Sequence, residues 1–262
     1  MGKIIAIAIS KGGVGKTTTA VNLSLALSKK NKKVLLIDVD PSGQCLSSFA
    51  LDSNLEKGDV FDVFTSTKKI DQVIYETEYE NLWCIPMKPS SYEAEIRLAN
   101  LSQHFSSLKY SLTTIALQYD FIFIDCPPIL SGTTSHILNI ANSVLIPITA
   151  SKYSFDELER ILNHVKTIKE KTNNELKIEG ILLTLDEPRT KLSHNVKKKL
   201  ILKYPNFILK TTIPKTVKIR EATFKNKPVL FYDPDSIGAK AFKNLADEIL
   251  LRNELSDFFF RG

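Results

Sequence analysis

An apolar run that leads straight into a glycine-rich turn constrains this chain more than any other feature. Residues 4–9 (Ile-Ile-Ala-Ile-Ala-Ile) have the length and β-branched character of a buried strand. Residues 11–18 follow as Lys-Gly-Gly-Val-Gly-Lys-Thr-Thr and open a segment with helical character. A strand, a glycine turn and a helix N-terminus in this order gather backbone N–H groups in one concavity, which the helix dipole makes positive. The sequence therefore predicts a cradle for the phosphates of a nucleotide.

Apolar, β-branched runs recur along the chain with helical patterns between them. Continuous apolar strands that alternate with helices indicate a parallel sheet covered on both faces. We therefore expect an α/β fold, with a mostly parallel twisted sheet and helices on both faces, in a single domain over residues 1–262. Residues 52–81 show no clear pattern, and we expect short peripheral helices there. The predicted strands are residues 3–9, 33–38, 82–86, 120–125, 143–148, 178–184 and 207–211. The predicted helices are residues 16–30, 92–100, 105–118, 132–141, 154–172, 190–203 and 236–252.

The composition indicates a globular protein of a reducing compartment. With 43% hydrophobic and 24% charged residues, the chain can bury a core and keep a polar surface. No apolar stretch approaches the roughly 18 residues that a membrane helix needs. Cys45, Cys84 and Cys126 are widely spaced and form no C-x-x-C pair. This spacing argues against a zinc site or a disulfide framework and favours the cytoplasm.

The glycine-rich turn departs from the generic phosphate-binding pattern G-x-x-x-x-G-K-[ST]. Ser10 stands where that pattern has glycine, and Lys11 is an additional lysine. In the generic pattern, Lys16 would reach the β- and γ-phosphates and the Thr17 hydroxyl would bind Mg²⁺. Lysine followed by Gly-Gly-x-Gly-Lys-Thr-Thr resembles the deviant Walker A motif of the ParA/MinD ATPases. The resemblance implies a P-loop NTPase in which ATP is bound by Lys11, Gly12, Gly13, Val14, Gly15, Lys16, Thr17 and Thr18.

A second motif places two carboxylates, Asp38 and Asp40, at the end of an apolar strand and before a Pro-Ser-Gly turn. One of them could lie near a metal ion while the other reaches an attacking water. In the ParA-like family this stretch is a switch, and its second carboxylate resembles the residue that positions the hydrolytic water. The resemblance assigns that role to Asp40, which we also count among the metal-binding residues. Ser42 and Gln44 depart mildly from the Gln and Asn that are commoner in the family.

A third motif, residues 121–128 (Phe-Ile-Phe-Ile-Asp-Cys-Pro-Pro), ends a buried strand on an aspartate. This is the Walker B arrangement, in which Asp125 helps to hold Mg²⁺. Residues 132–135 after it would form a second switch near the γ-phosphate. An apolar strand that ends in aspartate is a weak signal alone, but the order and separation of the three motifs make the set specific.

The resemblance gives Lys11 a particular role. In this family the signature lysine contacts the nucleotide bound by the partner subunit, so that ATP lies between two chains. The implied cycle is ATP binding, dimerisation, slow hydrolysis and separation, with Lys11, Lys16 and Asp40 as the catalytic residues. Further similarity at residues 212–222 and 227–239 extends the match over most of the chain, and it assigns Pro214 to the surroundings of the adenine.

The positive charge of the chain is concentrated in one segment. Residues 189–227 contain twelve Lys or Arg residues and one acidic residue, a net +11, while the whole chain carries +6. Phosphate backbones favour such patches through counterion release, without sequence preference. In ParA relatives, two arginine positions bind DNA non-specifically, and they match Arg189 and Lys218. We add Lys215 and Arg220 to this predicted DNA-binding set. We expect no helix-turn-helix extension before the phosphate loop, so specific operator binding is not predicted.

Several functions use this scaffold. We favour a ParA-type partition ATPase in the cytoplasm, associated with the nucleoid. It would form a homodimer, bind double-stranded DNA and be stimulated by a ParB-like protein. No membrane partner is expected. The alternative is a MinD-type ATPase that positions cell division at the membrane, which the phenylalanine-rich tail at residues 250–262 suggests. Acidic residues in that region oppose binding to anionic lipid. Two further hypotheses are a metabolic enzyme and a bacterial tyrosine kinase. The metabolic enzyme would be either a nitrogenase-reductase relative or an amide-forming synthetase. The ungrouped cysteines argue against the reductase, and the absence of a tyrosine-rich tail argues against the kinase.

Overall fold

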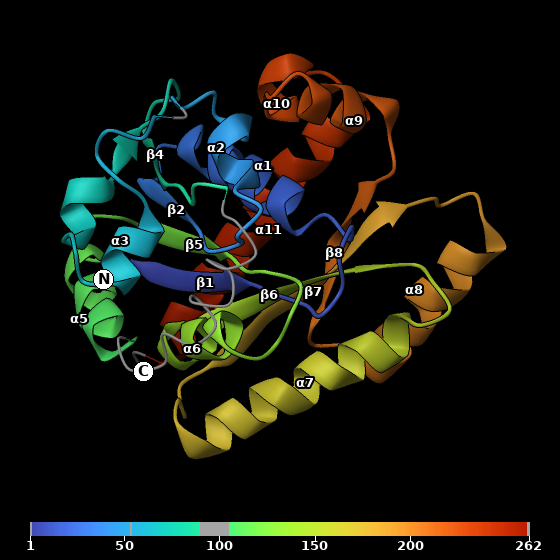
Figure 1. The fold of residues 1–262 in the computed structure, drawn as a ribbon. Coiled ribbons are helices and arrows are strands. Elements are labelled where there is room, and N and C mark those ends of the chain that lie inside the picture. The colour runs from blue at the N-terminus through green and yellow to red at the C-terminus, as the bar shows by residue number, and fades with distance from the viewer. Residues whose placement is uncertain (1, 53, 90–104, 261–262) are drawn as a thin grey trace.

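The computed structural model describes residues 2–52, 54–89 and 105–260 (Figure 1). Its strands form one eight-stranded sheet in the order β3-β4-β2-β5-β1-β6-β7-β8. The short strand β3 runs antiparallel to β4, and the remaining neighbours are parallel, which confirms the predicted α/β class. The strands are β1 (Lys3–Ile7), β2 (Val34–Asp38), β3 (Tyr75–Glu76), β4 (Leu82–Ile85), β5 (Phe121–Asp125), β6 (Ser143–Thr149), β7 (Lys177–Asp186) and β8 (Ile208–Pro214).

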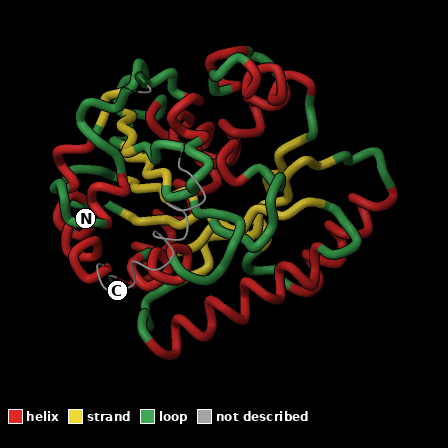
Figure 2. Tube along the Cα trace, viewed as in Figure 1, coloured by secondary structure: helices red, strands yellow, loops and turns green. Residues whose placement is uncertain are grey.

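Helices cover both faces of the sheet, as Figures 1 and 2 show. One face carries α1 (Lys16–Ser28), α2 (Gln44–Ser48), α9 (Val217–Phe224), α10 (Val229–Tyr232) and α11 (Ile237–Phe260). The other face carries α3 (Val60–Phe64), the 3₁₀ helix η1 (Ile70–Val73), α5 (Phe105–Ile115), α6 (Thr133–Ile140), α7 (Ser154–Lys171) and α8 (Lys191–Lys203).

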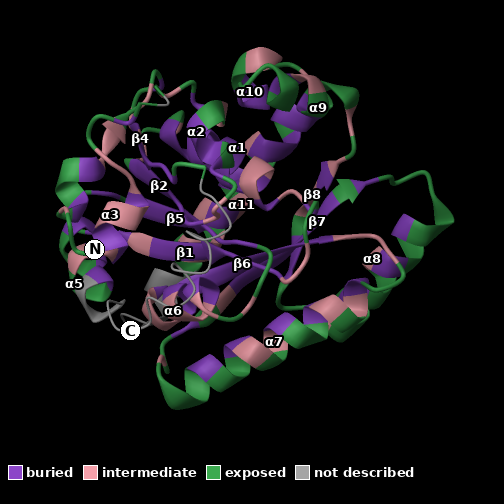
Figure 3. Cartoon of the chain, in the orientation of Figure 1, coloured by how far each residue is buried: buried purple, intermediate pink, exposed green. Residues whose placement is uncertain are grey.

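The central strands are buried on both sides (Figure 3). In β1, Ile4 and Ala6 belong to the core under α5, α6 and α7, while Ile5 and Ile7 belong to the core under α1 and α11. Successive side chains of a strand point to opposite faces, so a strand covered on both faces must be apolar throughout. This is why the apolar runs in the sequence located the strands.

All seven predicted strands are present, with ends shifted by a few residues; the last continues to Pro214. Short helices lie within residues 52–81, as predicted. The predicted helix at residues 92–100 lies outside the described residues. Four short elements, α2, β3, α9 and α10, were not predicted, because each spans too few residues to show a clear periodic pattern. Among the described residues, no helix is both long and apolar enough to cross a membrane.

Candidate nucleotide-binding site

The glycine-rich turn lies between β1 and α1, at the carboxyl edge of the sheet. Gly15 is the N-cap of α1 and has a φ of 83°, and Gly13 has a φ of 71°. Residues other than glycine rarely adopt this left-handed backbone conformation. A Cβ built at Gly12, Gly13 or Gly15 meets nothing within 4 Å. The loop therefore encloses open space beside the first N–H groups of a helix, and this space suits phosphate groups.

Two hydrogen bonds hold the loop in shape. Lys16 is 7% exposed, and its Nζ donates to the Lys11 carbonyl at 3.2 Å. From strand β7, two positions from β1 in the sheet, the buried Thr184 hydroxyl donates to the Val14 carbonyl at 2.7 Å. These contacts hold the concave loop in place before any ligand binds.

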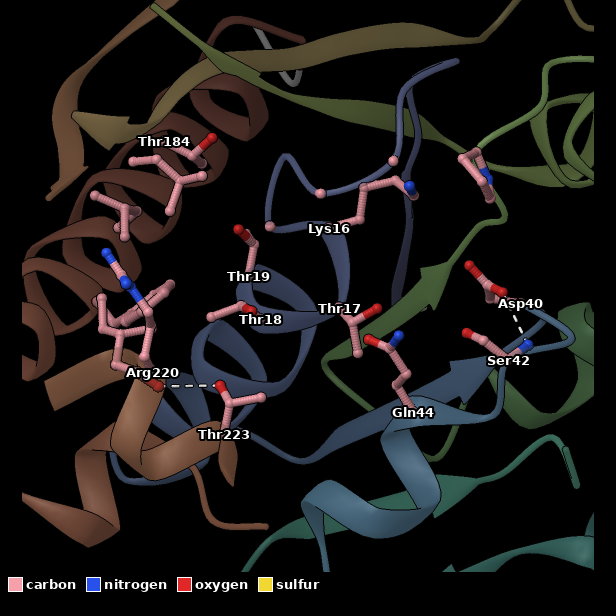
Figure 4. Close-up of a pocket in the computed structure, with 18 of the residues that line it drawn as sticks. Lys16, Thr17, Thr18, Thr19, Asp40, Ser42, Gln44, Thr184, Arg220 and Thr223 are labelled. Carbon is pink, nitrogen blue, oxygen red and sulfur yellow. Dashed lines mark hydrogen bonds between the residues drawn. The ribbon is translucent and has the colours of Figure 1, made fainter. Parts of the chain in front are cut away.

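A cavity of about 670 Å³ opens from the loop. In Figure 4, Lys16 and Thr17 lie in its middle, Asp40 and Gln44 at one end, and Arg220 and Thr223 at the other. Its volume is in the range of small-molecule sites. The lining residues are Gly12, Gly13, Gly15, Lys16, Thr17, Thr18, Thr19, Asp40, Ser42, Gln44, Pro128, Thr184, Leu185, Ile213, Ile219, Arg220, Thr223, Phe224 and Phe242.

Two buried aspartates stand side by side below the loop. Asp38 ends β2 and Asp125 ends β5, and the sheet register pairs them directly. Asp38 accepts hydrogen bonds from the backbone N–H groups of Asp40 and Cys45, each at 3.0 Å. The Cys45 thiol lies 3.8 Å from Asp125 Oδ2. The sequence did not point to Cys45 as part of this cluster, because the wide spacing of the three cysteines argued against a metal site.

Burial dominates the electrostatics of this pair. It raises the pKa of Asp38 to about 7, although two backbone N–H donors act in the opposite direction. Burial, followed by the neighbouring Asp38 charge, raises the pKa of Asp125 well above its usual value. Asp125 Oδ1 is buried and has no hydrogen-bond partner among the described residues, and the Thr17 hydroxyl lies near this carboxyl. An orphaned carboxylate oxygen beside a hydroxyl fits a magnesium ion, which takes oxygen ligands.

Asp40 lies on the cavity wall, two residues beyond Asp38. Its Oδ1 accepts the Ser42 N–H at 3.0 Å, which tightens the turn that follows β2. Gly43 has a φ of 62°, and a Cβ there would lie 2.6 Å from the Met87 carbonyl. Only glycine fits this position, where α2 begins. The turn thus directs Asp40 toward the cavity and Asp38 into the protein.

Lys11 behaves differently from the rest of the loop. Its Nζ lies 2.9 Å from Glu157 Oε1 on α7 and donates to the Ser151 hydroxyl at 3.2 Å. The described residues that line the cavity do not include Lys11. The structure therefore brings Lys16, Thr17, Asp40 and the loop glycines together, while Lys11 points away from its own cavity.

The end of the cavity opposite Asp40 is formed by α9 and its neighbours. Ile213 lines it, but Pro214, which was predicted near the adenine, is not among the described lining residues. Arg220, which was predicted for DNA binding, also lines this end of the cavity. The sequence did not point to Thr184, Thr223, Phe224 or Phe242, because apolar and hydroxyl side chains in this region carry no motif.

The other predicted DNA-binding residues lie outside the cavity. Arg189 is exposed in the loop before α8, and Lys215 follows β8, where it pairs with Glu187 at 3.2 Å. Lys218 on α9 contacts Glu221 at 3.0 Å and Asp233 at 3.9 Å. Helix α8 buries one side and exposes Lys191, Lys198 and others on the opposite side (Figure 3). A basic surface is present, but acidic neighbours offset part of its charge.

The fold and the phosphate loop define a P-loop nucleotide-binding protein. A family model described as an AAA domain matches residues 2–178. The chain is 38% identical to the sporulation initiation inhibitor protein Soj of Bacillus subtilis (strain 168), over 95% of this chain and 98% of Soj. It is 32% identical to the chromosome partitioning protein ParA of Myxococcus xanthus (strain DK1622), over 97% of this chain and 89% of that protein. The chain therefore belongs to the Soj/ParA family of partition ATPases.

The solved structures give the same fold. The septum site-determining protein MinD of Pyrococcus horikoshii OT3, complexed with Mg-ADP, superposes with a TM-score of 0.80. The two chains are 27% identical, and the match covers 95% of this chain and 96% of MinD. The family that the sequence predicted is confirmed.

Proposed function

We propose that this protein is a DNA-partition ATPase that dimerises on ATP, binds DNA without sequence preference and is stimulated by a ParB-like protein. The observation that carries the proposal is the shape of the loop. Its open glycine cradle faces the cavity together with Lys16 and Asp40, while Lys11 faces outward. A lysine of the phosphate loop that does not line its own cavity could serve the nucleotide bound by a second protomer, once it leaves its contacts with Glu157 and Ser151.

A few residues in and around the cavity would have distinct parts in the reaction. The loop N–H groups and Lys16 would bind the phosphates and compensate their charge. Thr17 and Asp125 would hold Mg²⁺, with Asp40 close by, and the ion supplies charge neutralisation on the phosphate oxygens. Asp40 orients the attacking water toward the γ-phosphate, and Lys11 of the opposite protomer places a further cation on the developing charge.

The exposed basic surface supports a DNA partner. Arg189 has no ion pair among the described residues, whereas Lys215 and Lys218 have acidic neighbours. Arginine also binds phosphate through two parallel hydrogen bonds, which lysine cannot do. We therefore expect Arg189 to contribute most to DNA affinity, and Arg220 to act at the nucleotide rather than on DNA. Such a protein works in the cytoplasm, on the nucleoid.

Sedimentation with two anionic surfaces tests the proposal. The protein is mixed with random-sequence double-stranded DNA or with anionic liposomes, with ATP, with ADP or without nucleotide, in the presence of Mg²⁺. We expect the protein to sediment with DNA when ATP is present, but not with ADP or without nucleotide. Retention on liposomes with ATP, and none on DNA, would instead indicate a MinD-type membrane ATPase.

A further inference from the structure

Lys11, the lysine to which the sequence resemblance gives a role at the partner's nucleotide, already has a well-defined position in the single protomer. Its Nζ forms an ion pair of 2.9 Å with Glu157 and a hydrogen bond of 3.2 Å with Ser151. The side chains of Lys11 and Glu157 are only 30% and 20% exposed. Partial burial reduces screening by water, so this pair is stronger than a surface ion pair.

The protein holds the acceptors of Lys11 rigidly. Ser151 donates its N–H to the Ser154 hydroxyl at 2.9 Å, and the two hydroxyls are also 2.9 Å apart. Glu157 lies in the first turn of α7, which begins at Ser154. These contacts fix the loop between β6 and α7 against the start of the helix, so the acceptors of Lys11 form a preorganised site.

Glu157 depends on Lys11 for its charge balance. Its second oxygen, Oε2, is buried and has no hydrogen-bond partner among the described residues. Lys11 is the cation with which Glu157 pairs. If Lys11 leaves, a largely buried carboxylate loses its compensating charge, which is unfavourable.

We propose that Glu157 is a positioning residue that holds Lys11 on its own protomer and must release it before an ATP dimer closes. This inference rests on the proposed nucleotide-dependent dimer. Lys11 carries a single positive charge, which cannot fully compensate both Glu157 and the phosphates of a second nucleotide, so the two compete for it. A triphosphate carries more charge than a diphosphate and displaces Glu157 more readily. Because the cost of releasing Lys11 is the same with either nucleotide, Glu157 sets a threshold for dimerisation that ATP exceeds more readily than ADP.

The test is Glu157→Gln, which removes the charge and keeps the shape. The matched control is Glu159→Gln, on the same helix, whose ion pair with Lys203 is about half exposed. Sedimentation velocity measures the dimer dissociation constant with Mg²⁺ and a non-hydrolysable ATP analogue, and again with ADP.

We expect the Glu157→Gln dimer to be tighter than the wild-type dimer. If release of one Lys11 costs about fivefold in affinity, two releases per dimer cost about 25-fold. Glu157→Gln should therefore lower the dissociation constant about 25-fold with the ATP analogue and allow partial dimerisation with ADP. Glu159→Gln should stay within about twofold of the wild type.

A second measurement examines the monomer directly. The rate of amine acylation at Lys11, followed by mass spectrometry of nucleotide-free protein, should rise in Glu157→Gln and stay unchanged in Glu159→Gln. An unchanged acylation rate in Glu157→Gln would overturn the inference. If the wild type dimerises, a dissociation constant for the Glu157→Gln dimer that is equal to or higher than the wild-type value would overturn it as well. If neither protein dimerises with any nucleotide, the proposed function fails as well, and the two failures are thereby distinguished.

Discussion

Gly12→Ala should weaken nucleotide binding and leave the stability of the nucleotide-free protein almost unchanged. Gly12 lines the cavity, a Cβ built there meets nothing within 4 Å, and its φ lies outside the left-handed region. The methyl group therefore adds no clash and little strain to the nucleotide-free protein. It would, however, project into the open cradle that the phosphates are proposed to fill.

The expected loss of affinity follows from the hydrogen bonds that the methyl group prevents. Two N–H···phosphate bonds at about 1.5 kcal/mol each give about 3 kcal/mol, which corresponds to about 150-fold in the dissociation constant of Mg·ATP. The free energy of unfolding should change by less than about 0.5 kcal/mol. Titration calorimetry measures the first quantity, and urea unfolding without nucleotide measures the second.

Gly13→Ala is the matched control, because its Cβ site is equally open but its φ is 71°. A left-handed alanine costs about 1–2 kcal/mol, so this variant should lose stability as well as affinity. If Gly12→Ala binds Mg·ATP as tightly as the wild type, the cradle does not hold the phosphates. If it unfolds as easily as Gly13→Ala, the open geometry of the loop is wrong.

Three further variants test the proposed catalytic carboxylate, the DNA-binding surface and the buried Asp38. Asp40→Ala should retain ATP binding, slow hydrolysis at least about 100-fold and accumulate an ATP-bound dimer; hydrolysis at the wild-type rate would refute its assignment to the attacking water. Replacing Arg189 and Lys218 together with alanine should make the slope of log affinity for DNA against log salt less negative by about 1.8, since each phosphate contact contributes about 0.9, and an unchanged slope would move the DNA surface elsewhere. Burial raises the pKa of Asp38 from 3.8 to about 7. Between these two pH values the folded protein holds a proton that the unfolded chain releases. The Mg²⁺-free protein should therefore lose stability as the pH rises from about 4 to about 7. Asp38→Asn cannot ionise, so its stability relative to the wild type should increase over that range by about 2–4 kcal/mol. Urea unfolding at pH 5 and pH 8 measures the change, and a constant difference between the two proteins would contradict it.

The sequence by itself determined the strands, the order of the motifs and the class of site. Each of these is a local property. A strand buried on both faces must be apolar along its length, and a phosphate loop needs glycines next to one another in the chain. The parallel arrangement then brings the carboxyl ends of the strands to one edge, so Asp40 and Asp125 could be assigned to the same site as Lys16.

Only the tertiary structure decided what depends on contacts between distant segments. Helix α9 was too short to predict, and its residues i and i+2 point in different directions, so Lys218 contacts Glu221 while Arg220 lines the cavity. The pairing of Lys11 with Glu157 joins the phosphate loop to α7. Neither residue type nor spacing could reveal this ion pair, because packing of helices on the sheet brings the two charges together.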